Sequence, residues 1–99
     1  MLDIAKKHLK LIHEVLGRFP ALKAVNIVAF GSRVNGKAKK FSDLDLCLKL
    51  HEKPDENLLN DLRYAFSDSD LPFYVDLVNY STCSDSFKSI IDRESIPFL

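Results

Sequence analysis

Residues 31–46, which read Gly-Ser-Arg-Val-Asn-Gly-Lys-Ala-Lys-Lys-Phe-Ser-Asp-Leu-Asp-Leu, decide the fold and the site of this chain. Gly31 and Ser32 directly follow the apolar run 25–30. A glycine that ends a buried strand lets backbone N–H groups turn toward a phosphate without a Cβ in the way. The Ser32 hydroxyl adds a polar group at the same point. The start of this segment therefore predicts a phosphate-binding turn.

Two carboxylates close the segment. Asp43 and Asp45 are two residues apart, and on a strand such a pair points to one face. Without a cation the two charges repel each other. Carboxylate oxygens that lie close together suit Mg²⁺, which proteins bind through one or two carboxylates and substrate phosphates. A third acid, Asp76, lies in the apolar run 73–78 and completes a cluster if that strand joins the same sheet.

Each element also has a simpler interpretation when taken alone. The glycine and serine can be an ordinary turn, the Asp43 and Asp45 pair the solvent face of an edge strand, and Asp76 an exposed charge. The joint occurrence favours a site, because an acid on an otherwise apolar strand is costly unless it is solvated, paired or bound to metal.

Composition places the chain among ordinary globular proteins. It has 99 residues, a formal net charge of zero and 46% hydrophobic residues, so we expect a single domain spanning residues 1–99. No apolar run approaches the roughly 20 residues of a membrane span, and lysines interrupt any signal-peptide core near the N-terminus. We therefore expect a cytoplasmic protein without a membrane partner. Cys47 and Cys83 have no metal-binding spacing and are expected to be free thiols.

The charge is distributed unevenly. Residues 1–40 hold nine Lys or Arg against two Asp or Glu, whereas residues 41–99 hold five against twelve. The five early cations fit the solvated side of a helix, so we do not expect direct nucleic-acid binding. Lys37, Lys39 and Lys40 either help to hold a triphosphate or belong to a flexible surface loop.

Hydrophobic periodicity predicts alternating helices and strands, and hence an α/β (α+β) fold with a small sheet. Helices are expected from Asp3, as N-cap, to about residue 19, at 32–37, at 55–67, and after Ser81 or Ser84 as the cap. Strands are expected at about 24–30, 43–50 and 72–79, with a polar connection at 51–54 and an apolar end at 96–99 that packs on the core or on a partner. The second strand alternates: leucines at 44, 46, 48 and 50 face helices, while Asp43, Asp45, Cys47 and Lys49 face the site. His8 and His13 do not share a helix face as metal ligands would and are expected to be exposed or to pack on the fold.

Gly31-Ser32-Arg33 with Gly36, then Ser42-Asp43-Leu44-Asp45-Leu46 and Val75-Asp76-Leu77-Val78, resemble the signature of the nucleotidyltransferases related to DNA polymerase β. The set looks like the minimal nucleotidyltransferases, small proteins usually encoded beside a HEPN-domain toxin. The resemblance spans residues 24–96. It implies a minimal polymerase β-like fold, a small mixed sheet with helices packed mainly on one face.

The resemblance also implies a reaction. Asp43, Asp45 and Asp76 would be catalytic and would hold two Mg²⁺ ions, while Gly31, Ser32, Arg33, Lys39 and Ser42 would bind ATP. Asp76 would also take the proton of the attacking hydroxyl. The chain would be an adenylyltransferase antitoxin that transfers AMP to a tyrosine of a HEPN ribonuclease toxin. Two alternatives remain open: an antitoxin that acts by binding alone, and transfer to RNA or a small molecule.

Overall fold

Helices and strands alternate along the chain, as the sequence predicts. The computed structural model describes residues 2–50 and 56–98, so the predicted connection at 51–54 lies outside the described residues. The elements are α1 (Lys6–Gly17), the 3₁₀ helix η1 (Pro20–Ala24), β1 (Asn26–Phe30), α2 (Ser32–Asn35), β2 (Leu44–Lys49), α3 (Glu56–Ser67), β3 (Val75–Asn79), the 3₁₀ helix η2 (Tyr80–Thr82), α4 (Asp85–Glu94) and β4 (Ile96–Pro97).

The four strands form one mixed sheet in the order β3-β2-β1-β4. β1 runs antiparallel to β2 and to β4, and β2 runs parallel to β3. Phe30, the last residue of β1, pairs with Asp45, and Asp45 in turn pairs with Asp76 of β3. The end of β1 therefore meets the beginnings of β2 and β3 at one end of the sheet, which confirms the predicted mixed sheet.

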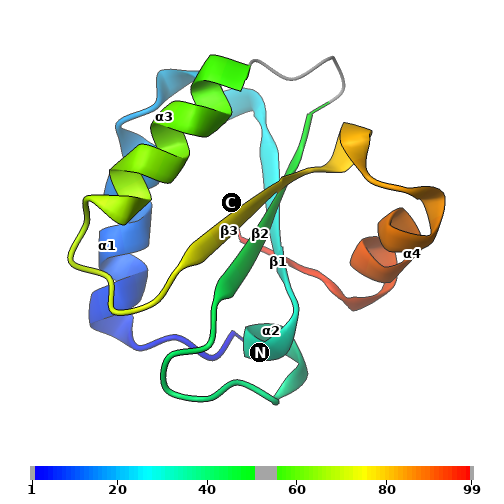
Figure 1. Ribbon diagram of the computed structural model, residues 1–99, viewed down its shortest axis with the longest axis horizontal. Coiled ribbons are helices and arrows are strands. Elements are labelled where there is room, and N and C mark those ends of the chain that lie inside the picture. The colour runs from blue at the N-terminus through cyan, green and yellow to red at the C-terminus, as the bar shows by residue number, and fades with distance from the viewer. Residues whose placement is uncertain (1, 51–55, 99) are drawn as a thin grey trace.

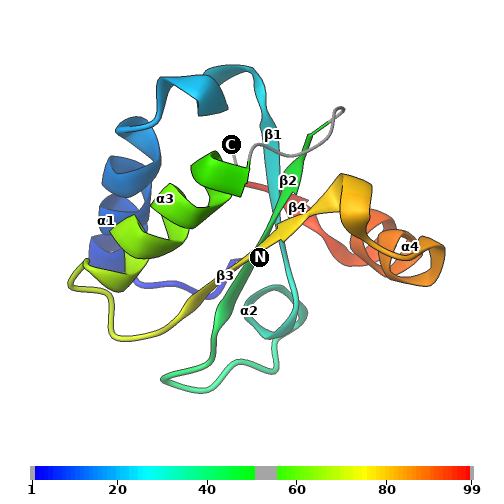
Figure 2. The ribbon, with the colours of Figure 1, turned by 45° about the horizontal axis from the view of Figure 1, so that its top comes forward.

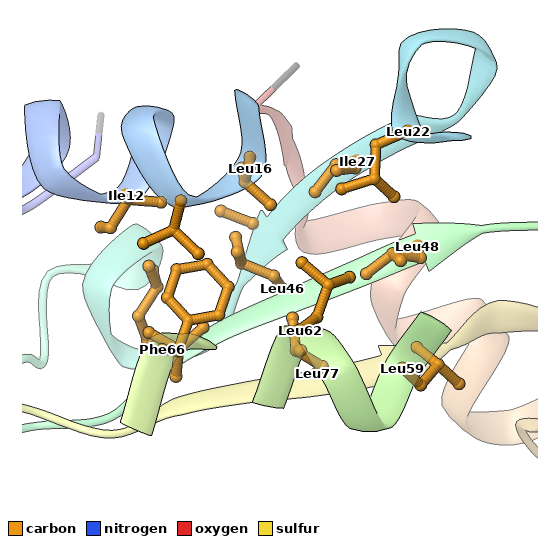
Figure 3. Packing of buried hydrophobic residues seen from close by; sticks show 14 of the residues in the cluster. Ile12, Leu16, Leu22, Ile27, Leu46, Leu48, Leu59, Leu62, Phe66 and Leu77 are labelled. Carbon is orange, nitrogen blue, oxygen red and sulfur yellow. The ribbon is translucent and has the colours of Figure 1, made fainter. Parts of the chain in front are cut away.

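One face of the sheet is covered by α1 and α3, which lie side by side in Figure 1. Figure 3 shows leucine and isoleucine side chains of both helices pointing onto the strands. The cluster includes Ile12 and Leu16 of α1, Leu59, Leu62 and Phe66 of α3, and Ile27, Leu46, Leu48 and Leu77 of the sheet. The alternating leucines of β2 thus face the helices as predicted, because they remove apolar surface from water on this side.

The other face of the sheet carries α4, which stands apart from α1 and α3 in both ribbon views (Figures 1 and 2). Beneath it lies a second, smaller cluster that contains Val28, Phe30, Cys47 and Ile91. Cys47 is fully buried there, so the prediction that its side chain faces the site is wrong. The physical reason is that Ile91 and Phe87 of α4 cover the middle of this face, and the Phe30 and Phe87 rings meet edge to face at 5.7 Å.

The first helix begins later than predicted. It starts at Lys6, and Ala5 at its N-cap position makes no side-chain cap. Asp3 is instead tied to α2, since its N–H donates to the Arg33 carbonyl at 2.7 Å. The last helix is capped by Ser84, whose Oγ accepts the Phe87 N–H at 3.2 Å; this confirms one of the two predicted caps.

Both ends of the described chain pack on the core. β4 pairs with β1, the Phe98 N–H donates to the Ile27 carbonyl at 2.8 Å, and the Phe98 ring stacks on His13 at 5.2 Å. His8 meets Phe73 edge to face, so both histidines pack on the fold.

The early cations are exposed as predicted: Lys6, Lys7, Lys10, Arg18 and Lys23. No helix within residues 2–50 and 56–98 has the length and apolar character needed to cross a bilayer.

Candidate active site

The three predicted carboxylates come together where β1 ends and where β2 and β3 begin. Asp45 and Asp76 are register partners on neighbouring parallel strands, and Asp43 stands immediately before β2. Asp43 is exposed, while Asp45 and Asp76 are partly buried. Segments more than thirty residues apart in the sequence thus place three acids at one end of the sheet.

Asp45 is the electrostatic centre of this group. Its pKa is raised from 3.8 to about 6, first by burial and then by the negative charges of Asp76 and Asp43. Both causes disfavour the ionised carboxylate. A divalent cation at this point would relieve the repulsion.

Gly31 makes room for Asp45. It has φ 81° and ψ −155°, a conformation that essentially only glycine adopts. A Cβ at this position would overlap the carboxylate of Asp45. α2 begins at the next residue, Ser32, and the Gly31 carbonyl accepts the N–H groups of Val34 and Asn35 at 3.0 and 3.1 Å. The glycine therefore allows the strand to turn into the helix while the carboxylate lies against the turn.

Arg33 holds the segment between α2 and β2 in place. The residue is only 6% exposed. Its guanidinium donates to three backbone carbonyls, those of Ser42 at 2.9 Å, Asp3 at 2.9 Å and Lys40 at 3.3 Å, and it lies 4.1 Å from the centre of the Phe73 ring. Nucleotide contact by Arg33 stays a prediction, and its observed contacts are within the chain.

Ser42 closes the same segment. Its Oγ accepts the Lys39 N–H at 2.8 Å, and its own N–H donates to the Lys39 carbonyl at 3.1 Å. The side chains of Lys37, Lys39 and Lys40 are exposed, and the Lys40 ammonium lies 5.3 Å from the centre of the Phe41 ring. These exposed positions are compatible with both predicted roles of the three lysines, which are contact with a triphosphate and membership of a flexible surface loop.

The donor atoms of the three acids are of the kind that a divalent metal ion needs. Three clustered carboxylates offer the hard oxygen ligands that Mg²⁺ prefers, and the pKa of Asp45 is raised by burial and then by the negative charges of Asp76 and Asp43. Among the described residues, no three carboxylate, imidazole or thiol groups converge on one ion position. The carboxylate chemistry of the site fits a divalent cation, although the three acids as placed do not surround a single ion position.

Two aromatic side chains beside the carboxylates are left uncovered. Phe41 is 62% exposed and Tyr74 is 56% exposed. Strand alternation in the sequence places Tyr74 on the face of Asp76, but only the structure shows that its ring is uncovered. The burial of Arg33 also has no signal in the sequence, because the residue stands in a polar, lysine-rich stretch.

The fold and the site define a nucleotidyltransferase. Residues 8–98 match the family described as polymerase beta, nucleotidyltransferase, and the chain belongs to that family. It is also similar to a probable protein adenylyltransferase, MntA, of Haemophilus influenzae, with 45% identity over 93 residues that cover 93% of this chain and 79% of the relative. The resemblance stated from the sequence is thereby confirmed.

Solved structures agree with the fold. One chain of a toxin–antitoxin crystal structure with AMP-PNP superposes with a TM-score of 0.71 and 22% identity, covering 92% of this chain and 72% of that chain. A chain of the toxin–antitoxin MntA-HepT superposes with a TM-score of 0.64 and 18% identity, covering 96% and 72%. At these identities the likeness concerns the fold alone.

Proposed function

We propose that this chain is an adenylyltransferase antitoxin that transfers AMP from ATP to a hydroxyl, a tyrosine, of a cognate HEPN ribonuclease toxin. The observation that carries the proposal is the juxtaposition of Asp45 with Asp76 and Gly31, which leaves concentrated negative charge beside a backbone turn. Support comes from a relative that is a probable protein adenylyltransferase and from a related fold in a toxin–antitoxin structure with AMP-PNP.

The first task of the chain's residues is to hold the triphosphate. Gly31 and Ser32 offer backbone N–H groups and a hydroxyl at the end of β1, and Lys39 is exposed on the adjoining segment. Arg33 and Ser42 keep this segment closed through their bonds to its backbone. In this proposal Arg33 acts by positioning the segment.

The second task is to activate the acceptor hydroxyl. Asp43, Asp45 and Asp76 would hold two Mg²⁺ ions, which would neutralise phosphate charge and lower the pKa of the hydroxyl. The hydroxyl oxygen forms a bond to the α-phosphorus of ATP, the bond from that phosphorus to the bridging oxygen breaks, and pyrophosphate leaves. Asp76, at the edge strand, receives the hydroxyl proton. The product is an AMP ester of the acceptor.

The acceptor would be presented by a partner protein. A positioned hydroxyl gains a large rate advantage over one that diffuses in, and a docked toxin would supply such a position. A related fold occurs in the toxin–antitoxin MntA-HepT, which supports a toxin as that partner.

The test mixes the purified chain with the HEPN-type toxin encoded beside it, ATP and Mg²⁺, and reads the intact mass of the toxin. We expect a gain of one or more AMP units, which the double variant Asp43→Ala with Asp45→Ala abolishes while it still binds the toxin. Asp68→Ala, an exposed acid in the turn after α3, is the matched control and should transfer normally.

The binding-only antitoxin makes the opposite prediction. In that case the toxin is silenced without any mass gain, and the double variant silences it equally well. The third reading, transfer to RNA or a small molecule, predicts consumption of ATP with labelled AMP on that acceptor and none on the toxin.

A further inference from the structure

The chain carries three tyrosines, and their surroundings differ. Tyr64 is 73% exposed on α3, which covers the helical face of the sheet. Tyr80 follows β3, and its hydroxyl donates to Asp92 Oδ2 at 2.8 Å. Tyr74 directly precedes β3, at the end of the sheet where the carboxylates lie, and is 56% exposed. Of the three, Tyr74 is therefore the tyrosine that adjoins the candidate active site.

The register of the sheet places Tyr74 across from Asp43. Val75 pairs with Leu44 in the parallel ladder of β3 and β2. Tyr74 stands one step before this pair, and its carbonyl accepts the Leu44 N–H at 2.9 Å, so the ladder continues to it. Neighbouring strands lie about 4.8 Å apart. Tyr74 and Asp43 are thus direct neighbours across the two chain segments.

The Tyr74 side chain belongs to the same face of the sheet as the carboxylates. Phe73 and Val75, on either side of it, both pack in the cluster beneath α1 and α3. Successive side chains of a strand point to opposite faces, so Tyr74 and Asp76 share the face away from these two helices. Tyr74 also borders a pocket of about 200 Å³ that residues of α3 line together with Phe73 and Val75. It therefore stands between that pocket and the carboxylates.

A tyrosine at this position is long enough to reach a bound substrate. Any group that the carboxylates hold lies beyond their oxygens, further from the sheet. The tyrosine hydroxyl is at the far end of an aromatic ring, whereas the oxygens of Asp43 and Asp76 directly follow Cγ. Within residues 2–50 and 56–98, no partner holds the Tyr74 hydroxyl, in contrast to that of Tyr80. The Tyr74 hydroxyl is thus free to reach a phosphate bound at the carboxylates.

We propose that Tyr74 is an internal acceptor: with ATP bound and no toxin docked, the chain transfers AMP to its own Tyr74 hydroxyl. The hydroxyl oxygen forms a bond to the α-phosphorus of ATP, the bond from that phosphorus to the bridging oxygen breaks, pyrophosphate leaves, and the hydroxyl proton passes to Asp76. The proposal rests on the proposed function, because it uses the same carboxylates. An acceptor that is already in place needs no docking step, so proximity favours transfer within one molecule.

The first experiment incubates the purified chain with ATP and Mg²⁺ in the absence of toxin. Intact mass detects the transfer, and fragmentation of the labelled peptide identifies the residue. We expect one AMP unit on Tyr74. AMP on a different residue would overturn the internal acceptor.

Two tyrosine variants accompany the wild type. Tyr74→Phe keeps the ring and removes only the hydroxyl, so the mass gain should be lost. Tyr64→Phe is the matched control, because it removes an exposed hydroxyl on α3, and it should be labelled as the wild type is. Thermal unfolding and affinity for a non-hydrolysable ATP analogue show that both variants are folded and bind nucleotide. A mass gain that persists in Tyr74→Phe would overturn the assignment.

A mixing experiment tests whether the transfer occurs within one molecule. Tyr74→Phe retains the carboxylates, and the double variant Asp43→Ala with Asp45→Ala retains Tyr74. Transfer within one molecule leaves both proteins of the mixture unlabelled, and the labelled fraction of the wild type at a given time should not depend on protein concentration. AMP on the double variant would show transfer between copies and would overturn the internal acceptor.

Chemical modification locates Tyr74 without any transfer. Tetranitromethane nitrates accessible tyrosine rings, so Tyr74 and Tyr64 should both react in the free protein, since both are exposed. The non-hydrolysable ATP analogue with Mg²⁺ should slow the nitration of Tyr74 and leave that of Tyr64 unchanged. Equal nitration of Tyr74 with and without the analogue would place its ring away from the nucleotide and would overturn the proposal.

Failure of the proposed function is recognised separately. A chain that labels the toxin but never itself retains the proposed function and loses the internal acceptor. A chain that labels Tyr74 but not the toxin supports the internal acceptor and overturns the toxin as substrate. A chain that binds the ATP analogue and labels neither protein overturns both proposals.

Discussion

At the scale of single residues, the site depends on the fit between Gly31 and Asp45. The glycine has a positive φ, and its missing Cβ leaves the space that the Asp45 carboxylate occupies. The pKa of Asp45 is raised first by burial and then by the neighbouring charges of Asp76 and Asp43. The same contacts that would prepare this point for a cation therefore reduce the stability of the metal-free protein.

The pKa of Asp45 makes stability depend on pH. Because the folded-state pKa of about 6 lies above the ordinary 3.8, the folded protein holds this proton more tightly than the unfolded chain, and stability is lost as pH rises from about 4 through 6. Asp45→Asn should remove this loss and be more stable than the wild type near pH 7, by about 1 kcal/mol after allowance for solvent screening.

Chemical denaturation of both proteins at pH 4.5 and pH 7.5 measures the difference. The exposed Asp68→Asn serves as control and should follow the wild type. If the difference in free energy of unfolding between Asp45→Asn and the wild type does not increase from pH 4.5 to pH 7.5, the raised pKa does not belong to Asp45.

Substitution of the three glycines by alanine distinguishes two costs in stability, the clash of a Cβ at position 31 with Asp45 and the backbone strain of a positive φ. Gly31→Ala should destabilise the fold by about 1 to 3 kcal/mol from strain alone, with a further loss because the Cβ meets Asp45. Gly36 also has a positive φ of 82°, but a Cβ there would meet no atom within 4 Å. Gly36→Ala should therefore cost only the backbone strain of the positive φ. Gly17→Ala, at the end of α1, meets nothing and should be neutral or slightly stabilising.

Thermal unfolding ranks the three variants, and AMP transfer adds a second readout. We expect the order Gly17→Ala, Gly36→Ala, Gly31→Ala from most to least stable, with transfer lost in Gly31→Ala. Equal stability of the last two would mean that the carboxylate moves aside at no cost.

At the scale of elements, the segment between α2 and β2 is held by one buried cation. The Arg33 guanidinium links this segment, through the carbonyls of Ser42 and Lys40, to the chain before α1, through the carbonyl of Asp3, and to the Phe73 ring before β3. Arginine suits this place because its planar group donates several bonds in fixed directions. The segment between α2 and β2 is thus held in place by contacts with the protein interior.

Arg33→Met tests this positioning role. The substitution keeps an apolar stem but leaves three carbonyls without their donor, so we expect destabilisation by about 2 to 3 kcal/mol and weaker ATP binding as the segment loosens. Lys37→Met, an exposed cation of the same segment, should leave stability unchanged. Denaturation and ATP titration distinguish the roles: lost ATP affinity with full stability would instead indicate direct nucleotide contact by Arg33.

At the scale of the whole molecule, the two faces of the sheet are covered differently, and this leaves the site open. α1 and α3 cover one face over its length, while α4 packs on the other around Val28, Phe30 and Cys47 (Figure 2). Asp45 pairs with Phe30 at the border of this second cluster, and Asp45 and its partner Asp76 remain only partly buried. Solvent access at that end would allow the charged substrate of the proposed reaction to enter without disturbing the core.

The sequence by itself determined the alternation of helices and strands and the leucine face of β2, and it named Ser84 as one of two possible caps and the pair Asp43 and Asp45 as one face of a strand. These features rest on periodicity and on residue spacing within single segments, which survive without knowledge of distant contacts. The family signature, with Gly31 and Ser32 before Asp43 and Asp45, was equally local.

Only the tertiary structure decided the burial of Cys47, the late start of α1, the carbonyl bonds of Arg33 and the uncovered ring of Tyr74. Each depends on a contact with a distant part of the chain. Ile91 covers Cys47, and the Arg33 guanidinium donates to the Asp3 carbonyl. β3 lies at the edge of the sheet, and Tyr74 before it lines a pocket. Local pattern cannot specify such contacts, because the free energy that fixes them arises when segments pack together and not within any one of them.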